Sequence, residues 1–323
     1  MSAVNVTLDS AESWKQAVPS EYERRCMLLW SIVITVVSVV GNTTVLFASI
    51  RYNAIKLDKI SLVLIKNLAV ADLGFTFTVL LTTGSILLKE YPYSSGVCMA
   101  ADYAAYLFSG LDVLLICALN INKLTTLVFP LHARLATARA GYGIAAGMWA
   151  LALLVIAVCG FTGDIVTQQV PSTFFCQNET GSEVGYAVFF VAIMVIRILP
   201  SLVIMATTIS LLCRLHQARG LQKQGVFTIL IVSTVFLIAS LPYALYFILK
   251  NVLTPAELEA TWFIVFYRFA KYLLYLNFAA NPLIYYVSVK SFKDFIRATV
   301  GRVVKRVPKK TVKVTPRTQS CNF

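Results

Sequence analysis

The stretch MLLWSIVITVVSVVGNTTVLFASI, residues 27–50, contains no charged side chain over its whole length. A helix of about 20 apolar residues is long enough to cross the hydrocarbon core of a bilayer. Two further stretches, residues 140–163 and 225–249, are also free of charge and exceed that length. These three stretches predict transmembrane helices, and they place the chain among membrane proteins.

Four more apolar stretches have the length of a span but carry isolated charges; they are residues 60–88, 97–127, 184–213 and 260–287. The chain is 58% hydrophobic and 13% charged, whereas soluble domains carry about 25% charged residues. The sequence therefore predicts an all-α membrane protein built as a bundle of seven transmembrane helices.

Lysine and arginine are unevenly distributed between the segments that connect the predicted spans. An odd number of spans places the two termini on opposite sides, and cytoplasmic loops carry an excess of basic residues. Most of the 28 basic residues lie after the first, third, fifth and seventh spans. This predicts an extracellular N-terminus and a cytoplasmic C-terminus. The net charge of +13 is then explained by the anionic inner leaflet, without a nucleic-acid partner.

Three segments flank the predicted membrane domain, residues 27–289. Residues 1–26 form an extracellular tail, residues 290–306 an interfacial eighth helix, and residues 307–323 a basic cytoplasmic tail. In the eighth helix, apolar residues recur at helical spacing, with basic residues between them: Phe292, Phe295, Ile296, Thr299, Val300 and Val303. The pattern predicts an amphipathic helix in contact with membrane lipids; a solvated tail helix is the alternative.

Two features of the predicted extracellular segments depend on this topology. Asn5 and Asn178 begin Asn-X-Thr sequences, which predicts glycosylation at both residues. Cys98 opens the third span and Cys176 lies in the second outer loop. Both would face an oxidising compartment, which favours a disulfide bridge over two free thiols.

Particular glycine, polar, aromatic and proline residues mark the individual spans. They are Gly41, Asn42 and Val45 in the first span, Asn67 and Asp72 in the second, Cys98 in the third, Trp149 in the fourth, Pro200 in the fifth, Phe236 and Pro242 in the sixth, and Asn277, Asn281, Pro282 and Tyr285 in the seventh. In this order and spacing they resemble the rhodopsin family (class A) of G-protein-coupled receptors, in particular divergent members that are similar to peptide receptors. The resemblance implies an extracellular ligand and a heterotrimeric G protein as partners.

The resemblance also implies coupling and switch roles for Asn122, Lys123, Phe236, Pro242, Asn281, Pro282 and Tyr285. Several positions depart from the family pattern. The family's Asp-Arg-Tyr at the inner end of the third helix reads Asn122-Lys123-Leu124; Gln222 replaces the acid of the sixth helix, and Thr208 the tyrosine of the fifth. An ammonium lacks the planar donor fork of a guanidinium. We therefore expect low-efficiency coupling through Lys123, from a resting state without ionic restraint and with some ligand-independent activity.

Two aspartates are predicted to lie within the membrane, where an ionised side chain costs about 2.5–3.5 kcal/mol on insertion scales. The resemblance implies that Asp72, Asn277 and Asn281 form a sodium pocket, in which Asp112 replaces a hydroxyl residue. Two carboxylates cannot both ionise cheaply in a site of low dielectric. Either a sodium ion lies between them, since hard cations prefer oxygen ligands, or one carboxyl group is protonated. No other metal or cofactor is expected.

The outer halves of the predicted fifth and seventh spans contain three cations, Arg197, Arg268 and Lys271. Asp102 in the third span is an obvious counter-charge for one of them. Unpaired cations in a partly desolvated pocket are costly, and an anion on a ligand would compensate them. We therefore expect an anionic ligand, a peptide in the first place, or else an acidic metabolite or lipid.

Other residues bear on this ligand prediction. Structural ion pairs with Asp102, or with Glu257 and Glu259 in the nearby loop, are the alternative to ligand binding. The family's amine receptors carry an aspartate where this chain has Ala105, so a simple amine ligand is disfavoured. Tyr243 and Tyr275 would supply aromatic walls with polar tips.

The sequence thus predicts a plasma-membrane receptor that is not an enzyme, since its two histidines both lie at the predicted cytoplasmic face and no nucleophile cluster is evident. One alternative is a seven-helix protein that binds a ligand or a partner receptor without coupling to a G protein. A transporter or channel is the other alternative, disfavoured by the lack of internal repeats.

Overall fold

The computed structural model describes residues 19–51, 57–90, 92–129, 137–162, 165–170, 175–180, 183–218, 220–258 and 260–306. Six long helices are continuous: α2 (Glu21–Arg51), α3 (Lys59–Leu88), α4 (Ser95–Val128), α6 (Ala138–Thr162), α9 (Gly220–Val252) and α11 (Thr261–Ser288). A further crossing is built from α7 (Glu183–Ile193), the π-helix η1 (Met194–Ile198) and α8 (Leu199–Arg214). The short 3₁₀-helix η2 (Leu215–Gln217) follows α8.

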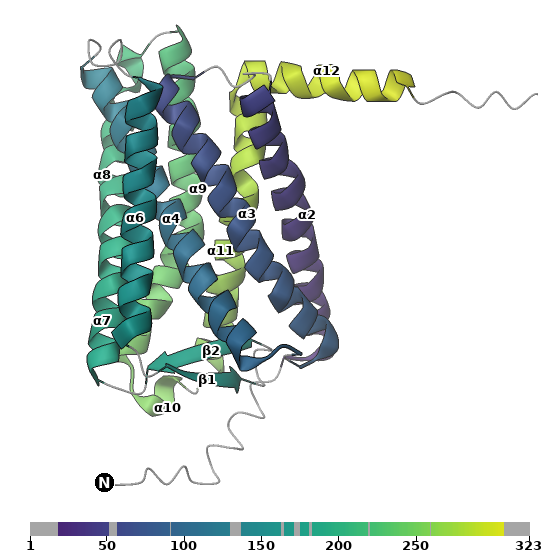
Figure 1. The fold of residues 1–323 in the computed structure, drawn as a ribbon, viewed down its shortest axis with the longest axis vertical. Helices are drawn as coiled ribbons and strands as arrows, with labels where there is room; N and C mark the ends of the chain where they lie inside the picture. Colours follow the sequence, from purple (N-terminus) through teal and green to yellow (C-terminus); the bar gives the residue numbers. More distant parts are fainter. Residues whose placement is uncertain are drawn as a thin grey trace, which may run out of the picture.

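These helices run side by side along one axis and form a seven-helix bundle (Figure 1). At one end, α12 (Lys290–Arg306) leaves the bundle at a steep angle. The antiparallel strands β1 (Ile165–Val170) and β2 (Phe175–Thr180) lie at the opposite end, near the short helix α10 (Pro255–Leu258). We refer to these as the α12 end and the hairpin end. The hairpin pairs Ile165 with Thr180 and Val170 with Phe175, and the sequence analysis did not predict it.

Among the described helices, six are long and apolar enough to cross a membrane; they are α2, α3, α4, α6, α9 and the crossing formed by α7, η1 and α8. The seventh, α11, is 28 residues long, or about 42 Å at 1.5 Å per residue. It combines apolar residues with polar ones such as Arg268, Lys271 and Asn277. α11 packs between α9 and α2, so its polar side chains can face protein instead of lipid.

The core lies along α3 and α4, whose buried side chains include Leu64, Leu68, Leu115 and Leu119. Lipid chains are as apolar as leucine, so helices in a membrane associate through close packing and polar contacts. Trp149 Nε1 on α6 donates to Asn67 Oδ1 on α3 at 3.1 Å. On α2, Asn42 Nδ2 donates to the Phe278 carbonyl of α11 at 3.0 Å.

Close packing is clearest where α2 meets α11. A Cβ atom on Gly41 would lie 2.7 Å from the Pro282 Cβ, which is closer than carbon atoms approach without repulsion. Gly41 therefore allows the two helices to touch at the proline of α11.

Candidate functional site

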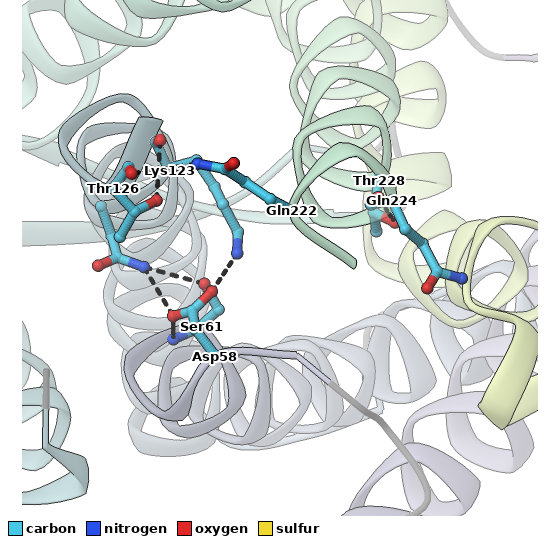
Figure 2. A network of polar contacts seen from close by, with 8 residues as sticks. Asp58, Ser61, Lys123, Thr126, Gln222, Gln224 and Thr228 are labelled. Carbon is cyan, nitrogen blue, oxygen red and sulfur yellow. Dashed lines mark hydrogen bonds and ion pairs between the residues drawn. The ribbon is translucent and has the colours of Figure 1, made fainter. Parts of the chain in front are cut away.

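Lys123 lies on α4 near the α12 end of the bundle and is 5% exposed. Its ammonium forms an ion pair with the carboxylate of Asp58 (Figure 2). The two residues are separated by 65 positions in sequence. The buried ammonium of Lys123 is thus neutralised by an acid at the start of the neighbouring helix α3.

Asp58 is the N-cap of α3 and has the extended backbone, φ −63° and ψ 155°, that such residues adopt. Its Oδ1 accepts a hydrogen bond from the Ser61 backbone N–H at 2.9 Å. Oδ1 also accepts one from Asn122 Nδ2 at 3.0 Å, and the same Nδ2 lies 3.0 Å from Ser61 Oγ. The helix cap fixes the carboxylate, and its Oδ2 remains directed at Lys123.

Burial raises the pKa of Asp58, but several favourable contacts more than offset it. The Lys123 charge and hydrogen bond, the Ser61 N–H and the Asn122 amide together hold the pKa of Asp58 below its ordinary value of 3.8. Asp58 therefore stays ionised at neutral pH, as the ion pair requires.

This pair bears on one expectation from the sequence. We expected a resting state without ionic restraint, because Asn122 and Gln222 replace two acids of the family pattern. The structure pairs Lys123 with Asp58, an acid that the sequence analysis did not single out. Gln222 Nε2 donates to the Thr126 carbonyl of α4 at 3.2 Å, so α9 is joined to α4 by a neutral contact.

The other predicted switch residues lie in the packed interior. Phe236 on α9, with Asn281 and Tyr285 on α11, are each 1% exposed. Pro242 and Pro282 interrupt α9 and α11 from within, where each removes one backbone hydrogen bond.

A polar contact beside these residues was not predicted. Asn120 Nδ2 on α4 donates to Ser233 Oγ on α9 at 2.7 Å. Thr208 Oγ1 on α8 lies 3.4 Å from Asn120 Oδ1. Thr208, the replacement for the expected tyrosine, thereby contacts the residue that joins α4 to α9.

The two intramembrane aspartates and their predicted asparagine partners form one buried cluster. Asn277 Nδ2 donates to Asp112 Oδ2 at 2.6 Å, and Asn281 Nδ2 donates to Asp72 Oδ2 at 3.0 Å. Asp72 and Asp112 are 0% and 1% exposed, and the two carboxyl groups lie close enough to interact.

Four oxygen atoms of this cluster accept no hydrogen bond from an N–H or O–H of the described residues: Asp72 Oδ1, Asp112 Oδ1, Asn277 Oδ1 and the Tyr285 hydroxyl. A proton on one carboxyl group would join Asp72 to Asp112 by a hydrogen bond. Buried polar atoms are normally satisfied. Carboxylate and amide oxygens are also the ligands that a hard cation prefers, so the side chains present fit a sodium ion.

Arg197, whose direction could not be predicted, faces the bundle interior. It lies in the π-helix η1, and its guanidinium carbon is 5.4 Å from the centre of the Tyr243 ring on α9. Its charge interacts with that of Asp112, and its Nε is buried without a hydrogen-bond partner among the described residues. Arg197 therefore lies between the hairpin-end aromatic residues and the central aspartates.

The two cations of α11, Arg268 and Lys271, lie near tyrosine side chains and interact with the charges of acids. Lys271 Nζ donates to Tyr267 Oη at 3.2 Å, and its charge interacts with that of Asp102. Arg268 is 9% exposed and interacts with the charge of Glu23. Glu23 was not predicted to take part.

Three more residues were predicted to contact the ligand, namely Tyr243, Tyr275 and Ala105. The Tyr243 ring lies beside that of Tyr246, with ring centres 5.8 Å apart and the planes tilted by 36°. Tyr275 is 3% exposed and packs edge-on against Phe75, with Ala105 beside the same cluster. Glu257 accepts hydrogen bonds from Thr254 N and Oγ1 at 2.9 and 2.8 Å; Glu259 lies outside the described residues.

Cys98 is buried and disulfide-bonded, and β2, which contains Cys176, packs against α4. The side chains of Cys176 and Asn178 lie outside the part of the chain that the structure describes, as does Asn5. The Cys98–Cys176 pairing and both glycosylation sites therefore stay predictions.

Residues 41–285 match the family model of the seven-transmembrane receptors of the rhodopsin family. The chain is 25% identical over 300 residues to G-protein coupled receptor 183 of Salmo salar, with 88% of this chain and 81% of that protein covered. It is 25% identical over 266 residues to somatostatin receptor type 4 of Rattus norvegicus, covering 78% and 67%.

A third relative is the probable G-protein coupled receptor 174 of Mus musculus, which is 23% identical over 278 residues, covering 81% of this chain and 82% of that protein. Among solved structures, squid rhodopsin matches with a TM-score of 0.74 at 15% identity, covering 89% of this chain and 88% of that one. At this identity the structural match shows the fold alone.

Proposed function

Because the chain belongs to the rhodopsin family of seven-transmembrane receptors, we propose that it binds an anionic extracellular ligand at its hairpin end and signals to a heterotrimeric G protein at its α12 end. The main support for an anionic ligand is a group of three cations, Arg197 on η1 with Arg268 and Lys271 on α11. The excess of basic residues in the loops of the α12 end supports its assignment to the cytoplasm.

The surroundings of the cations support an anion with an apolar body. Tyr243, Tyr246 and Tyr267 form a continuous aromatic group with ring centres 5.8 and 4.7 Å apart. A carboxylate or phosphate on the ligand would accept charge-assisted hydrogen bonds from a guanidinium or ammonium. The long second outer loop, residues 164–183, favours a peptide whose free C-terminus reaches the cations. An acidic metabolite or lipid offers the same chemistry.

The coupling proposal rests on the α12 end. Lys123 keeps one positive charge where the family pattern has arginine, and Tyr285 and Phe236 are buried nearby in the same core. The altered triplet Asn122-Lys123-Leu124 favours the rival function, a receptor-like protein that binds a ligand without coupling. Agonist-dependent nucleotide exchange by a purified G protein separates the two.

We also propose that sodium binds between Asp72 and Asp112. The unpartnered oxygens of this buried cluster support a cation there, while the charge of Arg197 offers Asp112 a partial alternative. Sodium, if bound, supplies one positive charge; the chain's own groups, Asn277 and Asn281, orient the two carboxylates.

The ligand class is tested by screening peptides with free C-termini, their amidated counterparts and acidic metabolites for stimulated nucleotide exchange. For any active compound, we expect the neutralised analogue to lose most of its potency. Arg268→Gln and Lys271→Gln should weaken the response to the parent compound and spare the analogue, since the lost contact is with the anion.

The matched control is Lys250→Gln, which removes an exposed charge from the same end of the bundle and should change neither response. Equal losses for the parent compound and the neutralised analogue would mean that the α11 cations only hold the receptor together.

A further inference from the structure

We propose that Asp58 is the acidic restraint of the resting receptor, that it holds the Lys123 ammonium against α3 beneath α9, and that this pair must open before Lys123 can serve the G protein. The inference rests on the coupling function proposed above. It assigns the restraint to a residue outside the third-helix and sixth-helix motifs, where the family pattern places its acids and this chain has Asn122 and Gln222.

Asp58 is held in place by contacts that do not involve Lys123. Asp58 caps α3 through the Ser61 N–H and accepts the Asn122 amide on the same oxygen, Oδ1. Its second oxygen, Oδ2, takes the Lys123 ammonium. Asn122 Nδ2 also lies 3.0 Å from Ser61 Oγ. Asn122, which stands where the family has an aspartate, therefore helps to hold Asp58 in place.

α9 covers the pair. A Cβ atom on Gly225 would lie 3.0 Å from Lys123 Nζ, 3.4 Å from Lys123 Cε and 3.6 Å from Leu57 Cδ2. The α9 backbone therefore rests on the lysine side chain at a position where any larger residue would press on it. Lys123 is 5% exposed, so the ion pair with Asp58 and the α9 backbone together keep its ammonium from the aqueous side.

Neutral contacts fix α9 over the pair. Gln222 Nε2 donates to the Thr126 carbonyl at 3.2 Å, and Gln224 Nε2 donates to the Ser288 carbonyl of α11 at 2.9 Å. Figure 2 shows Gln222 and Gln224 on α9 beside the Lys123–Asp58 pair. The ion pair itself joins α3 to α4 and does not include α9. The restraint thus keeps the charge of Lys123 away from the cytoplasmic surface, and either loss of the ion pair or displacement of α9 would expose it.

Asp58→Asn is the decisive substitution, because asparagine caps a helix as well as aspartate does and keeps an oxygen for Ser61. The charge is lost while the cap remains. The matched control is Asp294→Asn, which removes an exposed acid from α12 at the same end. Thermal melting of both variants shows whether the fold is kept.

The first readout needs no G protein. Reductive methylation followed by peptide mass spectrometry measures the accessibility of Lys123, with the exposed Lys59 as an internal reference. We expect Lys123 to be protected in the parent and in Asp294→Asn, and to react roughly tenfold faster in Asp58→Asn, the factor for one lost charge-assisted contact. Equal protection in Asp58→Asn and the parent would overturn the restraint.

The second readout is ligand-independent nucleotide exchange by a purified G protein. Asp58→Asn should raise it several-fold, and Gly225→Ala should raise it as well by pushing α9 off the pair. Combining the two substitutions should add little, because they release the same contact.

The two readouts separate the inference from the function on which it rests. Exposure of Lys123 in Asp58→Asn with unchanged exchange, in a receptor that does couple, would show that the pair does not restrain coupling. Exposure with no exchange in any variant would support the restraint and count against the proposed coupling.

Discussion

At the scale of single residues, Lys123 shows how one substitution moves an interaction to a new partner. An ammonium is a compact charge with three donors, whereas a guanidinium is a planar fork that binds a carboxylate through two parallel hydrogen bonds. In this chain the ammonium engages one oxygen of Asp58, and Ser61 and Asn122 occupy the other. The pair therefore forms without a guanidinium and without acids at residues 122 and 222.

Lys123→Arg should act in both directions. A guanidinium would hold Asp58 more firmly at rest and present more donors once released, so we expect lower ligand-independent exchange and a higher stimulated maximum. The control is Lys223→Arg on the exposed face of α9, which should change neither rate. Unchanged stimulated exchange in Lys123→Ala would show that Lys123 has no coupling role.

At the scale of elements, α3 and α4 carry two acid-centred clusters on their shared interface. Asp58 and Lys123 form one of them at the α12 end, and Asp72 and Asp112 form the other in the middle of the bundle. The first is neutral as a pair, since it combines one acid with one base. The second combines two acids and needs a cation, a proton or the nearby charge of Arg197 to balance it.

Sodium should therefore stabilise the purified protein. We expect a higher melting temperature in sodium chloride than in the same concentration of choline chloride, because binding to the folded state alone stabilises it by mass action. Asp112→Asn should reduce the difference, while the exposed Asp294→Asn should keep it. Identical melting of the parent protein in the two salts would rule out a sodium site.

At the scale of the whole molecule, the two ends of the bundle have different chemistry. The hairpin end gathers tyrosines and cations around α9 and α11, and a disulfide at Cys98 anchors the start of α4. The α12 end carries the Lys123 network and the helix that leaves the bundle. Arg197 and Asp112 interact between the two ends.

The predicted Cys98–Cys176 bridge tests this arrangement. Peptide mass spectrometry without reduction should recover the two cysteines in one cross-linked species. Cys176→Ser should lower the free energy of unfolding by about 2–4 kcal/mol, the usual worth of such a bridge, while Cys213→Ser, which alters an exposed free thiol, should leave it unchanged. Recovery of both Cys98 and Cys176 as free thiols would refute the pairing.

The sequence by itself determined the seven-helix bundle, because the length and apolar character of a span are local properties that a bilayer selects directly. The resemblance to the rhodopsin family also predicted that four residues form one pocket, namely Asp72, Asp112, Asn277 and Asn281. An aspartate just before an apolar helix is an N-cap signal, so the position of Asp58 as a cap was open to sequence reasoning.

Only the tertiary structure decided that Asp58 meets Lys123, since they lie on different helices and 65 residues apart. The direction of Arg197 was hidden because η1 is a π-helix, whose wider turn breaks the regular spacing from which a helix face is predicted. The approach of Gly225 to Lys123 could not be predicted either, because the two residues also lie on different helices. Contacts between helices depend on how the elements are placed, and no local pattern of residues records that placement.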